Sequence, residues 1–118
     1  MVEYTIDPEV YHEMRYGTKN VEIRLWNEKS QKIQIGDKIK FRVENTEKYL
    51  IVEVTNQSVF TTIDELYENE QIVQNCVMHY TKEECRNALF KIFGKENVLS
   101  SKLVGIEFKI DWKEMHSN

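Results

Sequence analysis

The sequence is poor in the residues that interrupt regular structure, with one proline and four glycines among 118 residues. So few interruptions argue against long irregular loops and low-complexity tracts. The longest apolar run, Tyr49-Leu50-Ile51-Val52, is far shorter than the roughly 20 residues that span a bilayer. No basic start followed by an apolar stretch opens the chain, so a secretory signal is not expected. We therefore predict a cytoplasmic protein that makes no membrane contact.

Cysteine and histidine are also scarce. Cys76 and Cys85 stand alone, and His12, His79 and His116 are scattered along the chain. Two cysteines in a chain without a secretory signal are typical of reduced thiols in a core. Because no Cys/His cluster has metal-ligand spacing, neither a metal site nor a cofactor is predicted.

What the chain does contain is the composition of one ordinary domain. Hydrophobic residues make up 41% and charged residues 31%, and the formal net charge is −4. A domain of this size buries roughly two thirds of the surface that its unfolded chain exposes, which allows a core without disulfides or metals. No internal repeat or linker divides the sequence. We predict a single domain over residues 1–112 and a C-terminal tail over residues 113–118.

Charge is distributed unevenly. Residues 15–42 hold eight basic and three acidic side chains, a net charge of +5, whereas residues 60–75 hold four acidic side chains and no basic one. A locally basic surface on an acidic protein suits a small anionic ligand or a short piece of RNA. The alternative is that strands simply carry lysine on their solvent-exposed face. The acidic stretch is a candidate surface for protein contacts.

Hydrophobic periodicity predicts the order β-α-β-β-β-α-α-β. Alternation with a period of two places strands at residues 2–6, 20–26, 38–43, 49–55 and 103–110. Strands in a run, with helices grouped at the ends, predict an α+β fold. We expect a mostly antiparallel sheet of about five strands that curls into a small barrel.

Local signals mark where the helices begin and end. Asp7 and Pro8 are typical of a helix start, with Asp7 as the cap, and Gly17 is typical of a helix end. Capping-box patterns predict two further helices, which begin after Thr62 and after Thr81.

The alternation also assigns faces to two strands. In the strand at 20–26, the residues expected to face the core are Val21, Ile23 and Leu25, and those sharing the other face are Glu22, Arg24 and Trp26. In the strand at 38–43, the inward residues are Ile39, Phe41 and Val43, and the outward residues are Lys38, Lys40 and Arg42.

The densest polar segment is Gly17-Thr18-Lys19-Asn20-Val21-Glu22-Ile23-Arg24, which has the spacing G-x-K-x-x-E-x-R. This segment resembles the signature of the ASCH domain, a small barrel of the PUA-like superfamily. Gly36-Asp37-Lys38-Ile39-Lys40-Phe41 resembles the family's Gly-Asp turn into a strand, and Val104-Gly105-Ile106-Glu107-Phe108 resembles its closing strand. The resemblance covers nearly the whole chain in the right order and implies a PUA-like barrel of the small stand-alone bacterial type.

The chemistry of this segment is consistent with ligand binding. Lys19 is expected at the mouth of a strand, and Glu22 and Arg24 point to the same face of it. Together with Trp26, these side chains can hold a base by stacking, hydrogen bonds and charge. The alternative is that Glu22 and Arg24 form only a surface ion pair, which usually contributes under about 1 kcal/mol, and that Trp26 is a packing residue.

The resemblance also implies an enzymatic alternative. Some small bacterial ASCH proteins resemble amidohydrolases that remove the acetyl group from acetylcytidine, using the motif lysine, a hydroxyl residue three positions on, and a glutamate early in a later helix. Lys19 matches the lysine and Glu84 the glutamate, whereas Glu22 occupies the hydroxyl position. A carboxylate cannot replace an alcohol nucleophile without changing the chemistry, and Thr18 is the nearest substitute hydroxyl. The alternative role for Glu84 is the capping box with Thr81.

Our functional prediction is binding of RNA, a nucleotide or a modified nucleoside in a cleft at the barrel rim beside residues 17–26. Lys19 and Arg24 are expected to donate hydrogen bonds to phosphate or base acceptors. Glu22 is expected to accept hydrogen bonds from an exocyclic amine or to orient Arg24. The residues expected to steer an RNA backbone are Lys38, Lys40 and Arg42. The first alternative is hydrolysis of an acetylated cytidine-type nucleoside by Lys19 and Glu84. The second is a protein-interaction module that uses residues 60–75.

Overall fold

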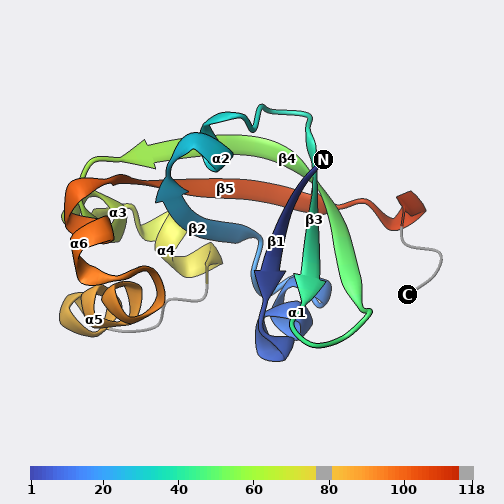
Figure 1. The fold of residues 1–118 in the computed structure, drawn as a ribbon, viewed down its shortest axis with the longest axis horizontal. Coiled ribbons are helices and arrows are strands. Elements are labelled where there is room, and N and C mark those ends of the chain that lie inside the picture. The colour runs from blue at the N-terminus through green and yellow to red at the C-terminus, as the bar shows by residue number, and fades with distance from the viewer. Residues whose placement is uncertain (77–80, 115–118) are drawn as a thin grey trace.

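The computed structural model describes residues 1–76 and 81–114, which form one curled five-stranded sheet flanked by helices (Figure 1). The elements are β1 (Val2–Ile6), α1 (Pro8–Arg15), β2 (Val21–Trp26), α2 (Glu28–Gln31), β3 (Lys38–Val43), β4 (Tyr49–Phe60), α3 (Ile63–Glu68), α4 (Glu70–Asn75), α5 (Lys82–Phe93), α6 (Lys95–Ser100), β5 (Lys102–Ile110) and the 3₁₀ helix η1 (Trp112–Glu114). The strand order across the sheet is β1-β3-β4-β5-β2. β1 pairs in parallel with β3, and the other three pairings are antiparallel. This arrangement confirms the predicted α+β fold with a mostly antiparallel, curled sheet.

The curl brings the two edge strands, β1 and β2, towards each other. β4 pairs with β3 over residues 49–53 and with β5 over residues 52–60, and the β5 pairing has a register shift between Val54 and Asn56. Across the gap between the edges, Arg24 of β2 donates a hydrogen bond to the Thr5 carbonyl of β1 at 3.2 Å. Lys29 of α2 donates to the Glu3 carbonyl of the same strand. Side chains therefore satisfy edge carbonyls that would otherwise be exposed to pairing with another chain.

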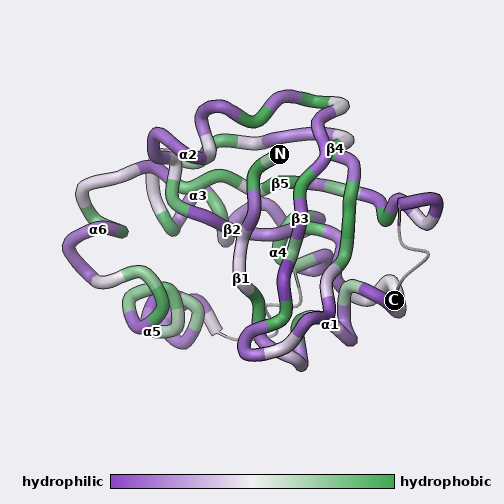
Figure 2. Tube along the Cα trace, turned by 45° about the vertical axis from the view of Figure 1, so that its right-hand side comes forward, coloured by the Kyte–Doolittle hydropathy of each residue, from purple (hydrophilic) through white to green (hydrophobic). Residues whose placement is uncertain are grey.

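Two hydrophobic clusters stabilise the fold, one inside the curl and one between the sheet and helices α3 to α6. β5 contributes to both, because Val104, Ile106 and Phe108 belong to the first cluster and Leu103 to the second. Hydrophobic and hydrophilic stretches alternate along the strands in the hydropathy-coloured trace (Figure 2). Each fully buried aliphatic or aromatic side chain is worth about 1.5–3 kcal/mol relative to exposure, so β5 couples the two halves energetically.

The strand faces agree with the predicted alternation. Ile39, Phe41 and Val43 are buried in the first cluster, and Val21 and Ile23 are buried in the second. Leu25 is only partly buried against the second cluster.

Two of the three predicted helix caps are confirmed. The hydroxyl oxygens of Thr62 and Thr81 accept hydrogen bonds, each at 3.2 Å, from the backbone N–H groups of Glu65 and Glu84. The predicted side-chain cap at Asp7 is wrong, because Asp7 occupies the cap position of α1 without a side-chain cap hydrogen bond. Pro8 follows at the first helical position, where a backbone N–H would have no helical partner, so that part of the predicted helix start is confirmed.

The structure adds three short helices, α2, α4 and α6, to the predicted elements. It also extends β4 beyond the predicted end at residue 55, since the polar residues 56–58 pair with β5. Of the predicted tail at 113–118, residues 115–118 lie outside the described residues, as do His79 and His116. In the described part of the chain, no helix combines the length and apolar character needed to cross a bilayer.

Candidate functional site

A cavity of about 450 Å³ lies between the β1–α1 segment, strand β2 and helix α5. Its volume is in the usual range for small-molecule sites. Thr5 and Ile6 of β1 line one side, and Lys19, Glu22 and Arg24 line it from the segment that leads into and along β2. The cavity therefore opens beside the gap between the two edges of the sheet.

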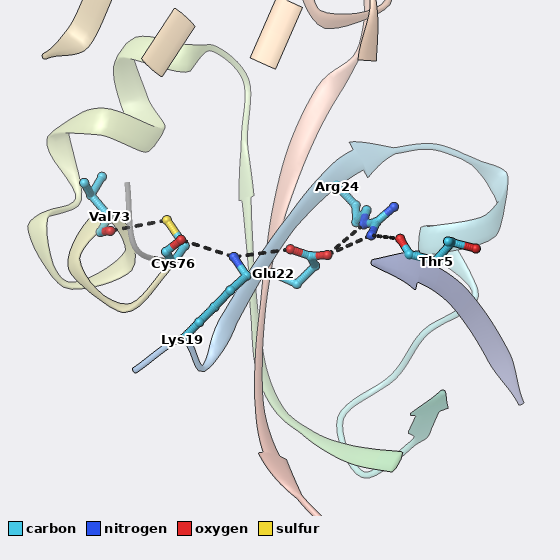
Figure 3. Close-up of polar contacts among 6 residues, drawn as sticks. All are labelled: Thr5, Lys19, Glu22, Arg24, Val73 and Cys76. Atoms are coloured by element: carbon cyan, nitrogen blue, oxygen red, sulfur yellow. Dashed lines mark hydrogen bonds and ion pairs between the residues drawn. The ribbon is translucent and has the colours of Figure 1, made fainter. Parts of the chain in front are cut away.

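Lys19, Glu22 and Arg24 form a charge cluster in which one carboxylate lies between two cations (Figure 3). Lys19 Nζ is 3.3 Å from Glu22 Oε1. Arg24 donates to Glu22 Oε2 from Nη2 at 2.8 Å and from Nε at 3.2 Å. Lys19 also donates to the Cys76 carbonyl at 3.1 Å, and Arg24 to the Thr5 carbonyl at 3.2 Å. The contacts thus run from the end of α4, across β2, to β1.

The local sequence explains how this cluster is positioned. Gly17 has a φ of +81°, a left-handed conformation that glycine adopts without strain and that ends α1. The turn that follows is closed by a hydrogen bond from the Lys19 N–H to the Glu13 carbonyl at 2.9 Å. β2 begins two residues after Lys19. Because side chains two apart on a strand share a face, Glu22 and Arg24 then point the same way.

Burial makes this cluster different from an ordinary surface ion pair. Lys19 and Glu22 are each only 7% exposed. Burial of the Glu22 carboxyl favours its neutral form, but the charges and hydrogen bonds of Lys19 and Arg24 outweigh that effect and lower its pKa. Glu22 is therefore ionised at neutral pH, and the three side chains together carry one positive charge.

The cluster keeps hydrogen-bonding capacity for a ligand. A lysine ammonium has three N–H donors, and among the described residues Glu22 and the Cys76 carbonyl take two of those of Lys19. Within residues 1–76 and 81–114, Arg24 uses Nε and Nη2, which leaves the two N–H groups of Nη1. The Glu22 carboxylate has further lone pairs. The side chains that line the cavity can thus both donate hydrogen bonds to a ligand and accept hydrogen bonds from it.

The remaining walls are of two kinds. Helix α5 provides an apolar wall, made by Ala88, Leu89, Ile92 and Phe93. The start of α1 provides acidic side chains around Val10, namely Asp7, Glu9 and Glu13. A ligand in this cavity therefore meets a polar cluster, an apolar helix face and an acidic helix face.

The family follows from a comparison of the sequence with family models. The model of the ASCH domain matches residues 5–100. The chain belongs to the ASCH domain family. The resemblance inferred from Gly17 to Arg24 is thereby confirmed, although no curated protein sequence matches the chain.

Solved structures agree with this assignment. The ASCH chain is 26% identical to hypothetical protein PH0355, with a TM-score of 0.78 over 92% of this chain and 97% of that one. It is 25% identical to a protein of Pyrococcus furiosus solved by NMR, with a TM-score of 0.72 over 92% and 96% of the two chains. A mutant of the ASCH protein of Zymomonas mobilis is 11% identical, with a TM-score of 0.62 over 91% of this chain and 67% of that one, which shows a shared fold alone.

Glu84 does not line the cavity of this ASCH domain. It is exposed in the first turn of α5, where its backbone N–H and its carboxylate both contact the Thr81 hydroxyl at 3.2 Å. These contacts match the capping role that was the alternative for this residue. Thr18 is likewise exposed and is not among the lining residues.

The predicted basic face of β3 is also separate from the cavity lining, and its cations are paired. Lys38 contacts Glu53 at 3.0 Å and Asp111 at 2.5 Å. Glu3 contacts Arg42 at 3.2 Å and Lys40 at 3.9 Å. Trp26 is half-buried and packs against the first hydrophobic cluster, as expected of a packing residue.

Several lining groups were missed by sequence reasoning. The Cys76 and Thr5 carbonyls are backbone groups, so no residue type signals their role. Glu9 and Glu13 are four apart on α1, a spacing that does signal a shared helix face. Across the described residues, no three His, Cys, Asp or Glu side chains are close enough together to hold a metal ion.

Proposed function

We propose that this ASCH domain binds a nucleoside in the cavity, either free or as one residue of an RNA strand. The observation that carries the proposal is the convergence of Lys19, Glu22 and Arg24 on a cavity of about 450 Å³. Membership of the ASCH family, whose PUA-like fold is associated with RNA binding, supports it.

The hydrogen-bonding groups of the cavity match the edge of a base. The unused N–H groups of Lys19 and Arg24 suit a carbonyl oxygen or a ring nitrogen, and Glu22 suits an exocyclic amine. Ile92 and Phe93 offer an apolar surface against which the flat ring can pack. One end of the ligand is thus recognised by polar contacts and its faces by apolar ones.

The test is a calorimetric titration with the four common ribonucleosides, acetylcytidine and short single-stranded RNA. We expect saturable binding that Lys19→Ala weakens by at least about ten-fold, since a charge-assisted hydrogen bond is worth roughly 1.5–3 kcal/mol. Lys32→Ala is the matched control, because Lys32 is a lysine outside the cavity whose side chain is 71% exposed. Absence of saturable binding, or equal affinity of the Lys19→Ala and Lys32→Ala proteins, would contradict the proposal.

Binding is favoured over hydrolysis by two features of the site. Glu22 stands where the hydrolase-like relatives have a hydroxyl residue, and Glu84 is not among the lining residues. Incubation with acetylcytidine, followed by chromatography, is expected to leave the nucleoside intact. Conversion above the level of a Lys19→Ala control would support the hydrolase instead.

The acidic stretch at 60–75 gives less support to a protein-interaction role. Asp64 contacts Lys82 at 2.9 Å and Arg86 at 3.4 Å, and the Glu65 carboxylate accepts from the Thr61 N–H at 2.8 Å. Part of this charge therefore holds α3 and α5 together, and the cavity remains the stronger candidate site.

A further inference from the structure

The charge of the cavity indicates which nucleosides it favours, an inference that rests on the proposed function. The lining contains two basic side chains, Lys19 and Arg24. It contains four acidic side chains, Asp7, Glu9, Glu13 and Glu22. The lining thus has a formal net charge of −2 at neutral pH, in contrast to the basic stretch of sequence from which Lys19 and Arg24 come.

The two cations of the lining are already neutralised in part. Glu22 contacts both of them, and the backbone carbonyls of Cys76 and Thr5 accept from Lys19 and Arg24 respectively. A phosphate entering the cavity would therefore compete with a buried carboxylate for the same donors. Such competition disfavours an anionic ligand.

Unlike Lys19 and Arg24, the three carboxylates of the β1–α1 segment have no partners of opposite charge among the described residues. Among the described residues, Asp7, Glu9 and Glu13 make no ion pair and no side-chain hydrogen bond. Glu13 is half-buried, and Glu9 precedes it by one helical turn on the same side of α1. Unpaired negative charge beside a partly closed space attracts a cation.

The geometry narrows the kind of cation. In the described residues, no three His, Cys, Asp or Glu side chains are placed to hold a metal ion together, so the carboxylates here do not form a dedicated metal site. Across the cavity, Ile92 and Phe93 present apolar surface, and Ile92 is 69% exposed. A flat ring with a delocalised positive charge satisfies both walls, because its face can pack on α5 while its charge lies near α1.

We infer that the preferred ligand is a nucleoside whose base is positively charged at neutral pH, as produced by methylation of a ring nitrogen. The acidic face of α1 selects the charge, the apolar face of α5 packs against the ring, and Lys19 with Arg24 meets the remaining acceptors of the base or sugar. Neutral nucleosides bind more weakly in the same place, and nucleotides are weakened further by their phosphate.

Two nucleosides with the same heavy atoms test the effect of the charge. 1-Methyladenosine is protonated and cationic at neutral pH, whereas its isomer N6-methyladenosine is neutral. By calorimetry at low salt we expect the cationic isomer to bind about five- to ten-fold more tightly, which corresponds to the sum of two or three weak ion pairs. A second pair, cationic 3-methylcytidine and neutral 5-methylcytidine, should show the same preference.

Matched variants locate the source of the preference. Glu9→Gln combined with Glu13→Gln is expected to reduce the ratio of the two affinities to about two-fold or less. Glu44→Gln combined with Glu47→Gln removes the same charge from exposed residues outside the cavity and should leave the ratio unchanged. Thermal melting checks that each variant folds. If the variant with Glu9→Gln and Glu13→Gln does not fold, the affinities of the unaltered protein for the two isomer pairs still test the charge preference.

The outcomes separate this inference from the proposed function. If neutral isomers bind as tightly as the cationic ones, or if nucleoside monophosphates bind more tightly than nucleosides, the charge preference is wrong and nucleoside binding stands. If neither the neutral nor the cationic nucleosides bind saturably, both are wrong. A preference that survives Glu9→Gln with Glu13→Gln in a folded protein would overturn the role of α1.

Discussion

Two clusters of basic side chains, on strands β2 and β3 of the same sheet, have different environments. At β2, Lys19 and Arg24 share the Glu22 carboxylate, which is only 7% exposed. At β3, Lys38, Lys40 and Arg42 pair with carboxylates at the surface. The first cluster has one lysine and one arginine and the second has two lysines and one arginine, so the main difference lies in how far each cluster is buried.

The sheet order explains this difference. β3 is an interior strand whose outward face meets solvent, so its ion pairs are screened by water and salt. β2 is an edge strand, and its charged face lies between the Thr5 carbonyl of the other edge strand and the Cys76 carbonyl at the end of α4. Closing a sheet on itself thus creates the enclosed charge cluster that a flat sheet would leave exposed.

The largest expected effect is on stability when Glu22 is removed. Glu22→Ala leaves Lys19 buried without a counter-charge, and breaking a buried ion pair in this way typically costs about 3–5 kcal/mol. Urea unfolding should show this loss in the free energy of unfolding. Glu53→Ala, which removes the surface partner of Lys38, is the matched control and should have a far smaller effect. Equal losses in the two variants would show that burial does not distinguish the clusters.

A related effect of Glu22 depends on pH. Its pKa is lowered in the folded protein, because the charges of Lys19 and Arg24 outweigh the burial that acts to raise it. The charged form therefore contributes stability that is present above the unfolded pKa of about 4.3 and is lost as the pH falls through the folded pKa.

Urea unfolding of the normal protein and of Glu22→Gln, repeated from about pH 7 down to about pH 3, measures this contribution. The stability difference between the two proteins should shrink below about pH 4.3. Glu47→Gln, an exposed control, should show little difference from the normal protein at any pH. A Glu22→Gln difference that stays constant with pH would contradict the lowered pKa.

A smaller effect is expected where an arginine joins the two sheet edges. Arg24 donates to the Thr5 carbonyl, and its guanidinium lies 4.3 Å from the centre of the Tyr4 ring. Arg24→Met should therefore cost about 1.5–3 kcal/mol of stability, the range for hydrogen bonds of charged groups. Arg42→Met on β3 is the control and should cost less, as Arg42 contacts the exposed Glu3 carboxylate. Indistinguishable denaturation curves for the two variants would mean that the edges need no side-chain bridge.

Much of the fold could be predicted because its core follows simple alternation. Ile39, Phe41 and Val43 are buried as their spacing predicts, and Gly17 ends α1 in a left-handed conformation. The short helices α2, α4 and α6 were missed because four to six residues carry too few apolar positions to show a helical period. β4 was cut short because its last residues are polar, although pairing with β5 keeps them in a strand.

The candidate site was only partly predictable. The family-like spacing identified Lys19, Glu22 and Arg24, which the structure brings together, while their ligand-binding role remains a prediction. The walls depend on tertiary contacts between α1, β2 and α5, which no local pattern encodes. Burial of Glu22 was also unpredictable, because a carboxylate on an alternating strand ordinarily faces water.

The smallest effect is expected from neutralising the β3 face. The variant with Lys38, Lys40 and Arg42 all changed to glutamine should bind nucleosides within about two-fold of the normal protein, since none of these residues lines the cavity. Labelled single-stranded RNA, titrated at several salt concentrations, measures their contact with phosphates. Each phosphate contact adds about 0.7 to the slope of log affinity against log salt.

In the β3 variant we expect the slope to fall by less than about 0.7, the value for one phosphate contact. The reason is that Glu3, Glu53 and Asp111 already pair with these cations, so phosphate would have to displace them. Changing Lys32, Lys91 and Lys102 to glutamine removes the same charge from exposed lysines and controls for net charge. A slope lower by about 2 in the β3 variant alone would assign RNA binding to that face after all. In that case the β3 cluster would bind the RNA backbone, and the cluster of Lys19, Glu22 and Arg24 would bind the base.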